Sequence, residues 1–219
     1  GNALKPLGGY GFTLHRLILS TKARLPGVHL FLFLQDYVPM YGLVNRAIKG
    51  LVVDQFGTDS WERICARAEI DANGFVAMEA YDDAITYALV GAAAEELGLD
   101  ASTILESFGE YWTLYTIEEG YADMLTLMGS SLDEFLDNLD PMHERIRATM
   151  PELIPPRFER EEQPDESSIL HYRSERPGLA PMVEGLLRGL AKRFKTELHV
   201  KHIDAPAPGH DRFLIREIK

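Results

Sequence analysis

Apolar residues recur at helical spacing through the middle of the chain. From Val44 toward Gln55 they stand at positions 44, 47, 48, 51 and 52, which is the 3.6-residue period of a helix with one buried face. A second helix is predicted to begin near Asp82 and to end at Gly98, because a glycine readily adopts the left-handed backbone of a helix end. Asp100 is placed to cap a third helix.

Capping patterns mark the next helices. An apolar face over Met124–Met128 ends at Gly129, and Ser131 with Glu134 forms a capping box for a short helix. Asp140-Pro141 then combines a capping side chain with a proline, which is favoured at the first helical position. This pair predicts a helix over roughly 141–150 with Asp140 as its N-cap.

The pattern changes after Met150, where prolines interrupt the helical spacing. The acidic stretch 159–166 is expected to be a solvated loop, and residues 181–194 repeat a helical stripe. Alternating or β-branched segments predict strands at Ile169–Tyr172, Glu197–Ile203 and Phe213–Ile218, with a hairpin loop over Ala205–Gly209. The expected fold is α+β, with a mostly helical N-terminal part followed by a helix-flanked antiparallel sheet.

The first 39 residues show no clear helical or strand period. Their apolar run, Val28–Leu34, is too short to cross a bilayer. Met40 opens the first segment with a readable pattern. We therefore expect residues 1–39 to be an extension of unknown role and residues 40–219 to be the folded domain.

Composition narrows the choice of partners and compartment. The 219 residues include 22 basic and 34 acidic side chains, a net charge of −12 that argues against nucleic acid and anionic membranes as partners. A local cationic site for an anionic ligand stays possible. Cys65 is the only cysteine, which excludes a disulfide framework and a cysteine-rich zinc site and favours a reducing, cytoplasmic location.

The sequence contains no motif of a nucleophilic or nucleotide-dependent enzyme: GxSxG, Walker, GxGxxG and HExxH patterns are all missing. We expect a non-enzymatic protein. His143 lies near the start of a predicted helix and has two readings, an ordinary surface histidine or the single axial ligand of a haem iron. One histidine is enough to hold a haem iron, because the porphyrin already supplies four nitrogen ligands.

A second candidate feature is the segment from Tyr172 to Arg176. In an extended strand, Tyr172, Ser174 and Arg176 would share one face and present a phenol, a hydroxyl and a guanidinium. All three donate hydrogen bonds to carboxylates, so they suit two haem propionates as well as an ordinary polar strand face. A third group, His199, His202 and His210, is poorly spaced for a shared metal because two of its members point to opposite strand faces.

These residues, with the runs around them, resemble the H-NOX family of haem-nitric oxide/oxygen binding domains. The family includes bacterial stand-alone gas sensors and the haem domain of soluble guanylate cyclase. A histidine followed 29 residues later by YxSxR is the specific part of the resemblance, which extends over residues 40–219. The runs are Met40-Tyr-Gly-Leu-Val-Asn-Arg-Ala, Tyr81-Asp-Asp, Thr86-Tyr87, Phe108-Gly-Glu, Glu119-Gly-Tyr121, Leu139-Asp-Pro-Met-His143, Pro155-Pro156 and Tyr172-x-Ser-x-Arg176.

The resemblance implies a role for each matching position. His143 would be the proximal ligand of haem b, and Met142 would lie beside it in the site. Tyr172, Ser174 and Arg176 would hold the propionates, and Pro156 would press on the porphyrin.

The resemblance also bears on the distal side. O₂-binding members of the family place a tyrosine where this chain has Pro181 or Met182, neither of which donates a hydrogen bond. Ile48 and Trp112 fall near other positions where O₂-binding members have polar groups, and Leu43 and Val44 add apolar wall. Trp112 is the one potential donor, although large aromatic residues more often pack as core. The resemblance thus implies a pocket that binds NO and CO and excludes O₂.

For the mechanism, the resemblance implies that NO weakens the iron–His143 bond, that the bond breaks, and that the helix carrying His143 shifts. The expected receivers of the signal are a separate histidine kinase or cyclic-di-GMP enzyme. Two other hypotheses stay open at this point. One is an O₂-binding or redox-sensing haem protein, and the other is an α+β partner-binding protein without haem.

Overall fold

The computed structural model describes residues 39–116 and 121–218. Four helices form its first part: α1 (Gly42–Phe56), α2 (Thr58–Ala68), α3 (Asp83–Leu97) and α4 (Ala101–Thr116). The short strands β1 (Pro39–Tyr41) and β2 (Ala80–Asp82) pair antiparallel beside them. The predicted start and end of α3 are confirmed: the Asp82 side chain caps the helix by accepting a hydrogen bond from the Ala84 amide, and Gly98 has φ +64°.

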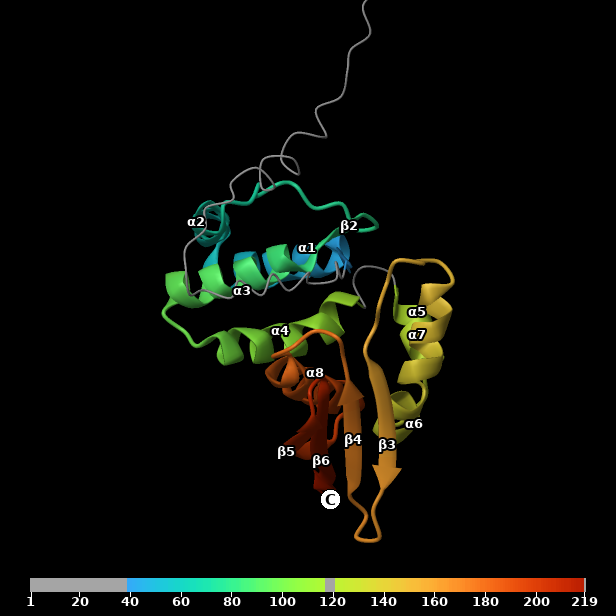
Figure 1. Cartoon of the computed structure of the whole chain (residues 1–219). Coiled ribbons are helices and arrows are strands. Elements are labelled where there is room, and N and C mark those ends of the chain that lie inside the picture. The colour runs from blue at the N-terminus through green and yellow to red at the C-terminus, as the bar shows by residue number, and fades with distance from the viewer. Residues whose placement is uncertain (1–38, 117–120, 219) are drawn as a thin grey trace, which may run out of the picture. The chain divides into compact units, whose positions relative to one another are not determined.

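Three short helices follow: α5 (Ala122–Thr126), α6 (Leu132–Asp137) and α7 (Leu139–Arg147). A four-stranded antiparallel sheet then forms in the order β3-β4-β6-β5, from β3 (Arg157–Glu162), β4 (Ser168–Arg173), β5 (Glu197–Ala207) and β6 (His210–Ile218). Helix α8 (Ala180–Phe194) connects β4 to β5. The α+β class is confirmed (Figure 1).

Two hydrophobic clusters divide this fold. The first joins α1 to α4 around residues such as Ile48, Trp61 and Phe108. The second joins α5 to α8 with one face of the sheet, around Phe135, Leu187 and Phe213. Helix α4 belongs to the first cluster and α8 mainly to the second, and the two helices pack against each other. The contact between α4 and α8 therefore connects the two halves of the domain.

Several boundaries differ from the sequence prediction. Helix α2 was not predicted, although it buries Trp61, Ile64 and Cys65. The expected loop 159–166 is wrong over its first part, because residues up to Glu162 form the edge strand β3. Charged side chains are compatible with such a strand because an edge strand exposes one of its sides, and charge there discourages pairing with another chain. Strand β5 extends to Ala207, which leaves a shorter hairpin turn than expected.

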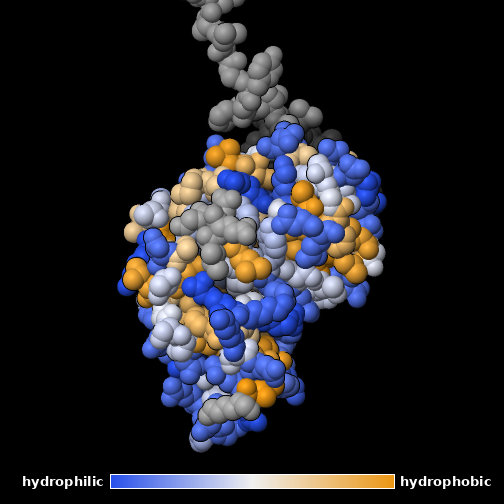
Figure 2. Space-filling model, turned by 180° about the vertical axis from the view of Figure 1, so that it is seen from behind, coloured by the Kyte–Doolittle hydropathy of each residue, from blue (hydrophilic) through white to orange (hydrophobic). Residues whose placement is uncertain are grey.

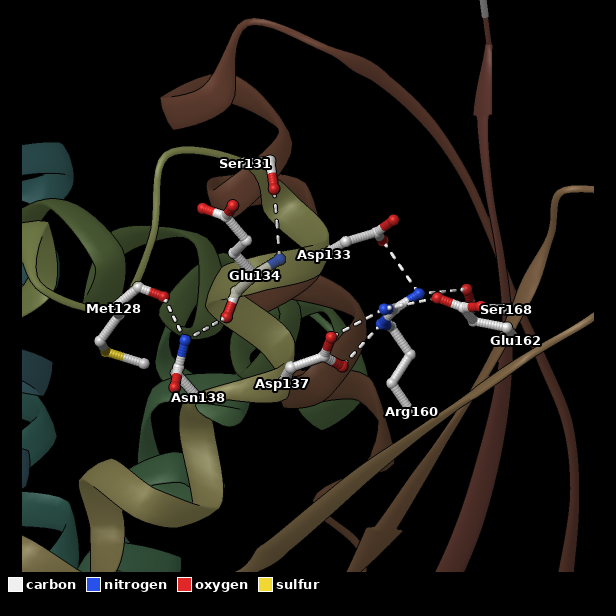
Figure 3. Close-up of polar contacts among 9 residues, drawn as sticks. All are labelled: Met128, Ser131, Asp133, Glu134, Asp137, Asn138, Arg160, Glu162 and Ser168. Atoms are coloured by element: carbon white, nitrogen blue, oxygen red, sulfur yellow. Dashed lines mark hydrogen bonds and ion pairs between the residues drawn. The ribbon is translucent and has the colours of Figure 1, made fainter.

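Helix α6 is attached to the sheet by Arg160, whose side chain is only 7% exposed. Its Nε and Nη2 donate to the two Asp137 carboxylate oxygens at 2.8 Å each, and its Nη1 donates to Ser168 Oγ at 3.2 Å (Figure 3). The hydrogen bonds from Arg160 hold the pKa of Asp137 below its usual value. At the start of α6, Ser131 accepts from the Glu134 amide as predicted, but the Glu134 carboxylate accepts from the Ser130 amide rather than from Ser131.

We expect Arg160→Leu to lower the free energy of unfolding by about 1–3 kcal/mol, because it removes charge-assisted hydrogen bonds from a buried guanidinium. The measurement is urea denaturation of the domain. Arg147→Leu is the matched control, since the Arg147–Glu144 pair lies within one helix and is solvent-exposed on both sides. That variant should change stability by less than about 0.5 kcal/mol, and equal effects of both variants would contradict the prediction.

Candidate functional site

A cavity of about 500 Å³ lies between the two hydrophobic clusters. Its wall is predominantly apolar, with a few polar groups, as is typical of small-molecule and cofactor sites. All nine residues predicted for the site line this cavity: Val44, Ile48, Trp112, Met142, His143, Pro156, Tyr172, Ser174 and Arg176. Residues more than 130 positions apart in sequence are thus brought to one place by the packing of the two halves.

His143 lies within α7, and its ring is oriented by a backbone carbonyl. Its Nδ1 is 3.0 Å from the carbonyl oxygen of Pro156. Because a carbonyl oxygen only accepts, Nδ1 carries the proton and Nε2 keeps the lone pair that a metal requires. Burial lowers the pKa of His143 and favours this neutral form. Metal-binding histidines commonly donate their second ring N–H to a carbonyl in this way.

Asp140 also positions α7, but not as the predicted N-cap. The helix begins at Leu139 with Asn138 as its N-cap residue, and it ends at Arg147 rather than near 150. Asp140 therefore lies within the first turn, where its carboxylate accepts a hydrogen bond from the Phe158 amide at 2.6 Å. This bond ties α7 to the start of β3. Phe158 in turn packs near the His143 ring, with a centroid distance of 6.0 Å.

The Tyr172–Arg176 segment differs from the predicted strand face. Strand β4 ends at Arg173, so Ser174 and Arg176 lie in a turn, where the Arg176 amide donates to Ser174 Oγ at 3.0 Å. Pro177 and Gly178 follow and do not continue a strand. All three predicted side chains still line the cavity, Tyr172 from β4 and the other two from the segment that follows it.

Arg176 is a buried cation at the edge of the cavity, with 6% of its surface exposed. One Nη1 hydrogen bond goes to the Ile154 carbonyl at 2.8 Å, and its Nε lies 3.6 Å from the Asp83 carboxylate. Tyr172 is buried beside it, and burial raises the pKa of the phenol, which therefore stays a neutral donor. The site thus places a guanidinium and two hydroxyl groups together, a set suited to carboxylates.

The residues expected on the distal side come from the first cluster. Val44 and Ile48 project from α1, and Met182 from α8 packs against the same cluster and lines the cavity, whereas Pro181 is not among the lining residues. Trp112 packs near Phe108 and Tyr115, with ring centroids 5.9 and 6.2 Å away. These aromatic contacts agree with a packing role for Trp112.

Several polar lining residues were given no role from the sequence. Thr86 and Tyr87 belong to one of the runs that carry the resemblance, and Tyr121 to another. The Tyr87 hydroxyl donates to the Pro177 carbonyl at 3.0 Å, and burial raises its pKa to about 12. Helical spacing could have placed Thr86 near Val90 on one face of α3, but it does not show that this face borders a cavity.

The remaining histidines do not converge on a metal. His210 contacts His171, with 3.0 Å between ring nitrogens, while His202 pairs with Asp211 at 2.9 Å. In the parts of the chain that the structure describes, no group of three or more His, Cys, Asp or Glu side chains is arranged to hold a metal ion. Any metal in the cavity would therefore depend on His143 together with a ligand that supplies its own donors.

These residues fit a haem. A tetrapyrrole needs one imidazole, and His143 offers Nε2 with Nδ1 already hydrogen-bonded. An apolar cavity suits the porphyrin face, and the buried Arg176 with its neighbouring hydroxyls suits carboxylate side groups. This donor set suits a haem better than a bare metal ion.

Comparison with known proteins agrees with this geometry. The family model for haem-NO-binding domains matches residues 41–202. The chain belongs to the H-NOX family. H-NOX domains bind haem. Soluble guanylate cyclase gcy-35 of Caenorhabditis elegans is 32% identical over 192 residues, which is 82% of this chain but 28% of the relative. The beta-2 subunit of rat soluble guanylate cyclase is 40% identical over 91 residues, 42% of this chain and 13% of that protein.

Solved H-NOX structures share the fold. An H-NOX protein from S. oneidensis, solved in its Fe(II)NO state, superposes with a TM-score of 0.74 at 20% identity and covers 82% of this chain and 100% of the other. An oxygen-binding H-NOX domain related to soluble guanylate cyclases superposes with a TM-score of 0.71 at 18% identity. The match covers 82% of this chain and 96% of the other. One fold thus carries both gas ligands, so selectivity depends on the side chains of each cavity.

The surface of the described residues is mixed in character. Figure 2 shows extensive hydrophilic surface with apolar side chains in separate patches. None of the described helices is both long and apolar enough to cross a bilayer. Residues 1–38, which hold nearly all of the expected extension, lie outside the described part.

Proposed function

We propose that residues 40–219, which β1 extends by one residue to Pro39, form a haem-dependent nitric oxide sensor domain and that the residues before it are not part of that domain. His143 would hold the iron, while Tyr172, Ser174 and Arg176 would anchor the propionates. The observation that carries this proposal is the His143 imidazole, which lines the cavity with Nδ1 bonded to Pro156 and Nε2 left for a metal. Haem b, when bound, supplies a ferrous iron with an open position for NO or CO.

Several residues around the cavity would have separate roles in holding the haem. The Pro156 carbonyl fixes the tautomer and direction of the His143 ring, and Pro156 itself lines the cavity, where it would press on the porphyrin. Arg176 offers positive charge that is shielded from water, where a charge-assisted hydrogen bond is worth more than at the surface. Met142, next to His143 on α7, contributes to the apolar wall.

Preference for NO over O₂ is supported by the distal wall. Val44, Ile48 and Met182 cannot donate a hydrogen bond to a gas ligand. A hydrogen bond from a neutral donor is worth about 0.5–1.5 kcal/mol, so its absence lowers O₂ affinity by up to roughly tenfold. NO and CO depend less on such a donor.

The signal would leave through α7. Among the described residues, this helix is tied to β3 and the segment just before it chiefly by the hydrogen bonds between Asp140 and the Phe158 amide and between His143 and the Pro156 carbonyl. If the bond between His143 and the metal broke, α7 could move to a second position. This shift requires that the gas ligand binds more tightly to the protein in that second conformation. A histidine kinase or cyclic-di-GMP enzyme, or a cyclase as in the curated relatives, would respond.

The single buried cysteine supports a cytoplasmic setting.

Absorption spectra of the ferrous, haem-loaded domain test this proposal. We expect a haem band, a five-coordinate spectrum after anaerobic addition of NO, and no stable oxygen complex in air. The Trp112→Phe variant should behave the same if Trp112 only packs. A stable oxygen complex would favour an O₂-binding or redox-sensing protein instead, and a protein that takes up no haem would refute the proposal.

A further inference from the structure

Thr86 contributes a hydroxyl group to the distal wall, next to apolar side chains. Thr86, in the first turn of α3, lines the cavity together with Val44 and Ile48 of α1 and Val90 one turn further along α3. A threonine hydroxyl can either donate or accept a hydrogen bond. The direction of its proton therefore decides whether this wall presents a donor or a lone pair to a small ligand.

The direction of that proton depends on Asn45. Thr86 Oγ1 donates to Asn45 Oδ1 over 2.7 Å, which uses the only proton of the hydroxyl. Asn45 comes from α1, is completely buried, and does not itself line the cavity. Thr86 therefore has only oxygen lone pairs left to offer a ligand in the cavity.

Burying the Asn45 side-chain amide costs free energy that its packing does not explain. Its Nδ2 is buried without a hydrogen-bond partner among the described residues. An unsatisfied buried donor costs about 1–3 kcal/mol, whereas a leucine of nearly the same shape would carry no such cost. In the opposite amide orientation Nδ2 would donate to Thr86 Oγ1, and the hydroxyl proton would be free to point into the cavity.

We propose that Asn45 is a positioning residue that keeps the Thr86 hydroxyl proton away from the gas ligand, so that Thr86 is not a donor to that ligand. This inference rests on the proposed function and specifies why the Thr86 hydroxyl group would not favour O₂. Asn45 acts through Thr86 and does not touch the ligand.

A double-mutant cycle tests this pair. The variants are Asn45→Leu, Thr86→Val and the two combined, all close in shape to the original side chains. The readouts are the C–O stretching frequency of the ferrous CO complex, the O₂ affinity, and the urea unfolding of the haem-free protein.

We expect Asn45→Leu alone to free the hydroxyl. The C–O frequency should fall, because a donor near the ligand strengthens electron donation from iron to CO, and O₂ affinity should rise by about two- to tenfold. Thr86→Val and the double variant should both match the wild type. Thr116→Val is the control, since Thr116 also lines the cavity but its hydroxyl is bonded to the Trp112 carbonyl within α4.

Two results would overturn the inference. If Asn45→Leu and the double variant give the same frequency, the freed hydroxyl does not reach the ligand. If Thr86→Val alone raises the frequency, the hydroxyl already donates in the wild type. Asn45→Ala replaces Asn45→Leu if the latter does not fold. A wild type without haem would instead refute the proposed function, while haem-free unfolding would still measure the coupling between Asn45 and Thr86.

Discussion

Replacing His143 with glycine is expected to leave a folded domain that retains almost no haem. Groups that merely support a metal-binding histidine are worth about 10–100-fold in metal affinity, so losing the histidine itself should weaken haem binding by at least roughly a hundredfold. Fold stability should change little in comparison, because His143 is only partly buried and α7 keeps the bond of Asp140 to Phe158. Haem content after gel filtration and haem-free urea unfolding separate the two effects.

Imidazole provides the decisive control for this variant. The glycine leaves a gap beside Pro156 into which free imidazole fits, so added imidazole should restore a haem band in His143→Gly. His199→Ala, at an exposed position on β5, should bind haem like the wild type. Unchanged haem content in His143→Gly would show that the iron ligand has been assigned to the wrong residue.

Most of the helices, although not α2, could be predicted from the sequence because helix signals are local. The stripe from Val44 and the caps of α3 depend on neighbours within four residues, so they could be recognised without knowing the fold. Strand β3 was not predicted, since residues such as Glu159 and Glu161 look like a solvated loop until β4 lies beside them. Pairing between strands is a tertiary property that composition does not reveal.

In the candidate site, too, some features could be predicted from the sequence and others depended on tertiary contacts. The positions of His143 and Arg176 could be predicted from their spacing through the family resemblance. The turn that carries Arg176 and the Pro156 carbonyl that fixes His143 could not, because both depend on contacts between separate elements. The pairing of Thr86 with Asn45 could not be predicted from the sequence either, because it depends on a hydrogen bond between α1 and α3.

The largest stability effect is expected at the contact between α4 and α8. A Cβ atom at Gly185 would lie well within 3.0 Å of the Glu106 backbone carbonyl, and one at Gly109 would meet the Met182 carbonyl in the same way. The obstacle is backbone in both cases, so no side chain can rotate to make room. The two helices touch this closely only because each has a glycine at the crossing.

We therefore expect Gly185→Ala to destabilise the domain by about 3 kcal/mol or more, the upper range for overpacking a core. The added methyl group must push α8 away from α4, and both helices line the cavity between the two clusters. Haem retention should fall along with stability in urea denaturation and haem titration. A loss of stability with normal haem retention would show that the cavity tolerates this separation.

Gly91→Ala is the matched control, because it makes the same substitution at a helix position that no other element approaches. A Cβ at Gly91, an exposed position in α3, would meet no atom within 4 Å. Alanine favours the helix over glycine, so this variant should gain about 0.5–1 kcal/mol and bind haem normally. Opposite signs for the two substitutions would locate the effect in the close approach of α4 and α8, whereas equal signs would contradict it. Since that approach joins the two clusters, it also determines the width of the cavity that His143 faces.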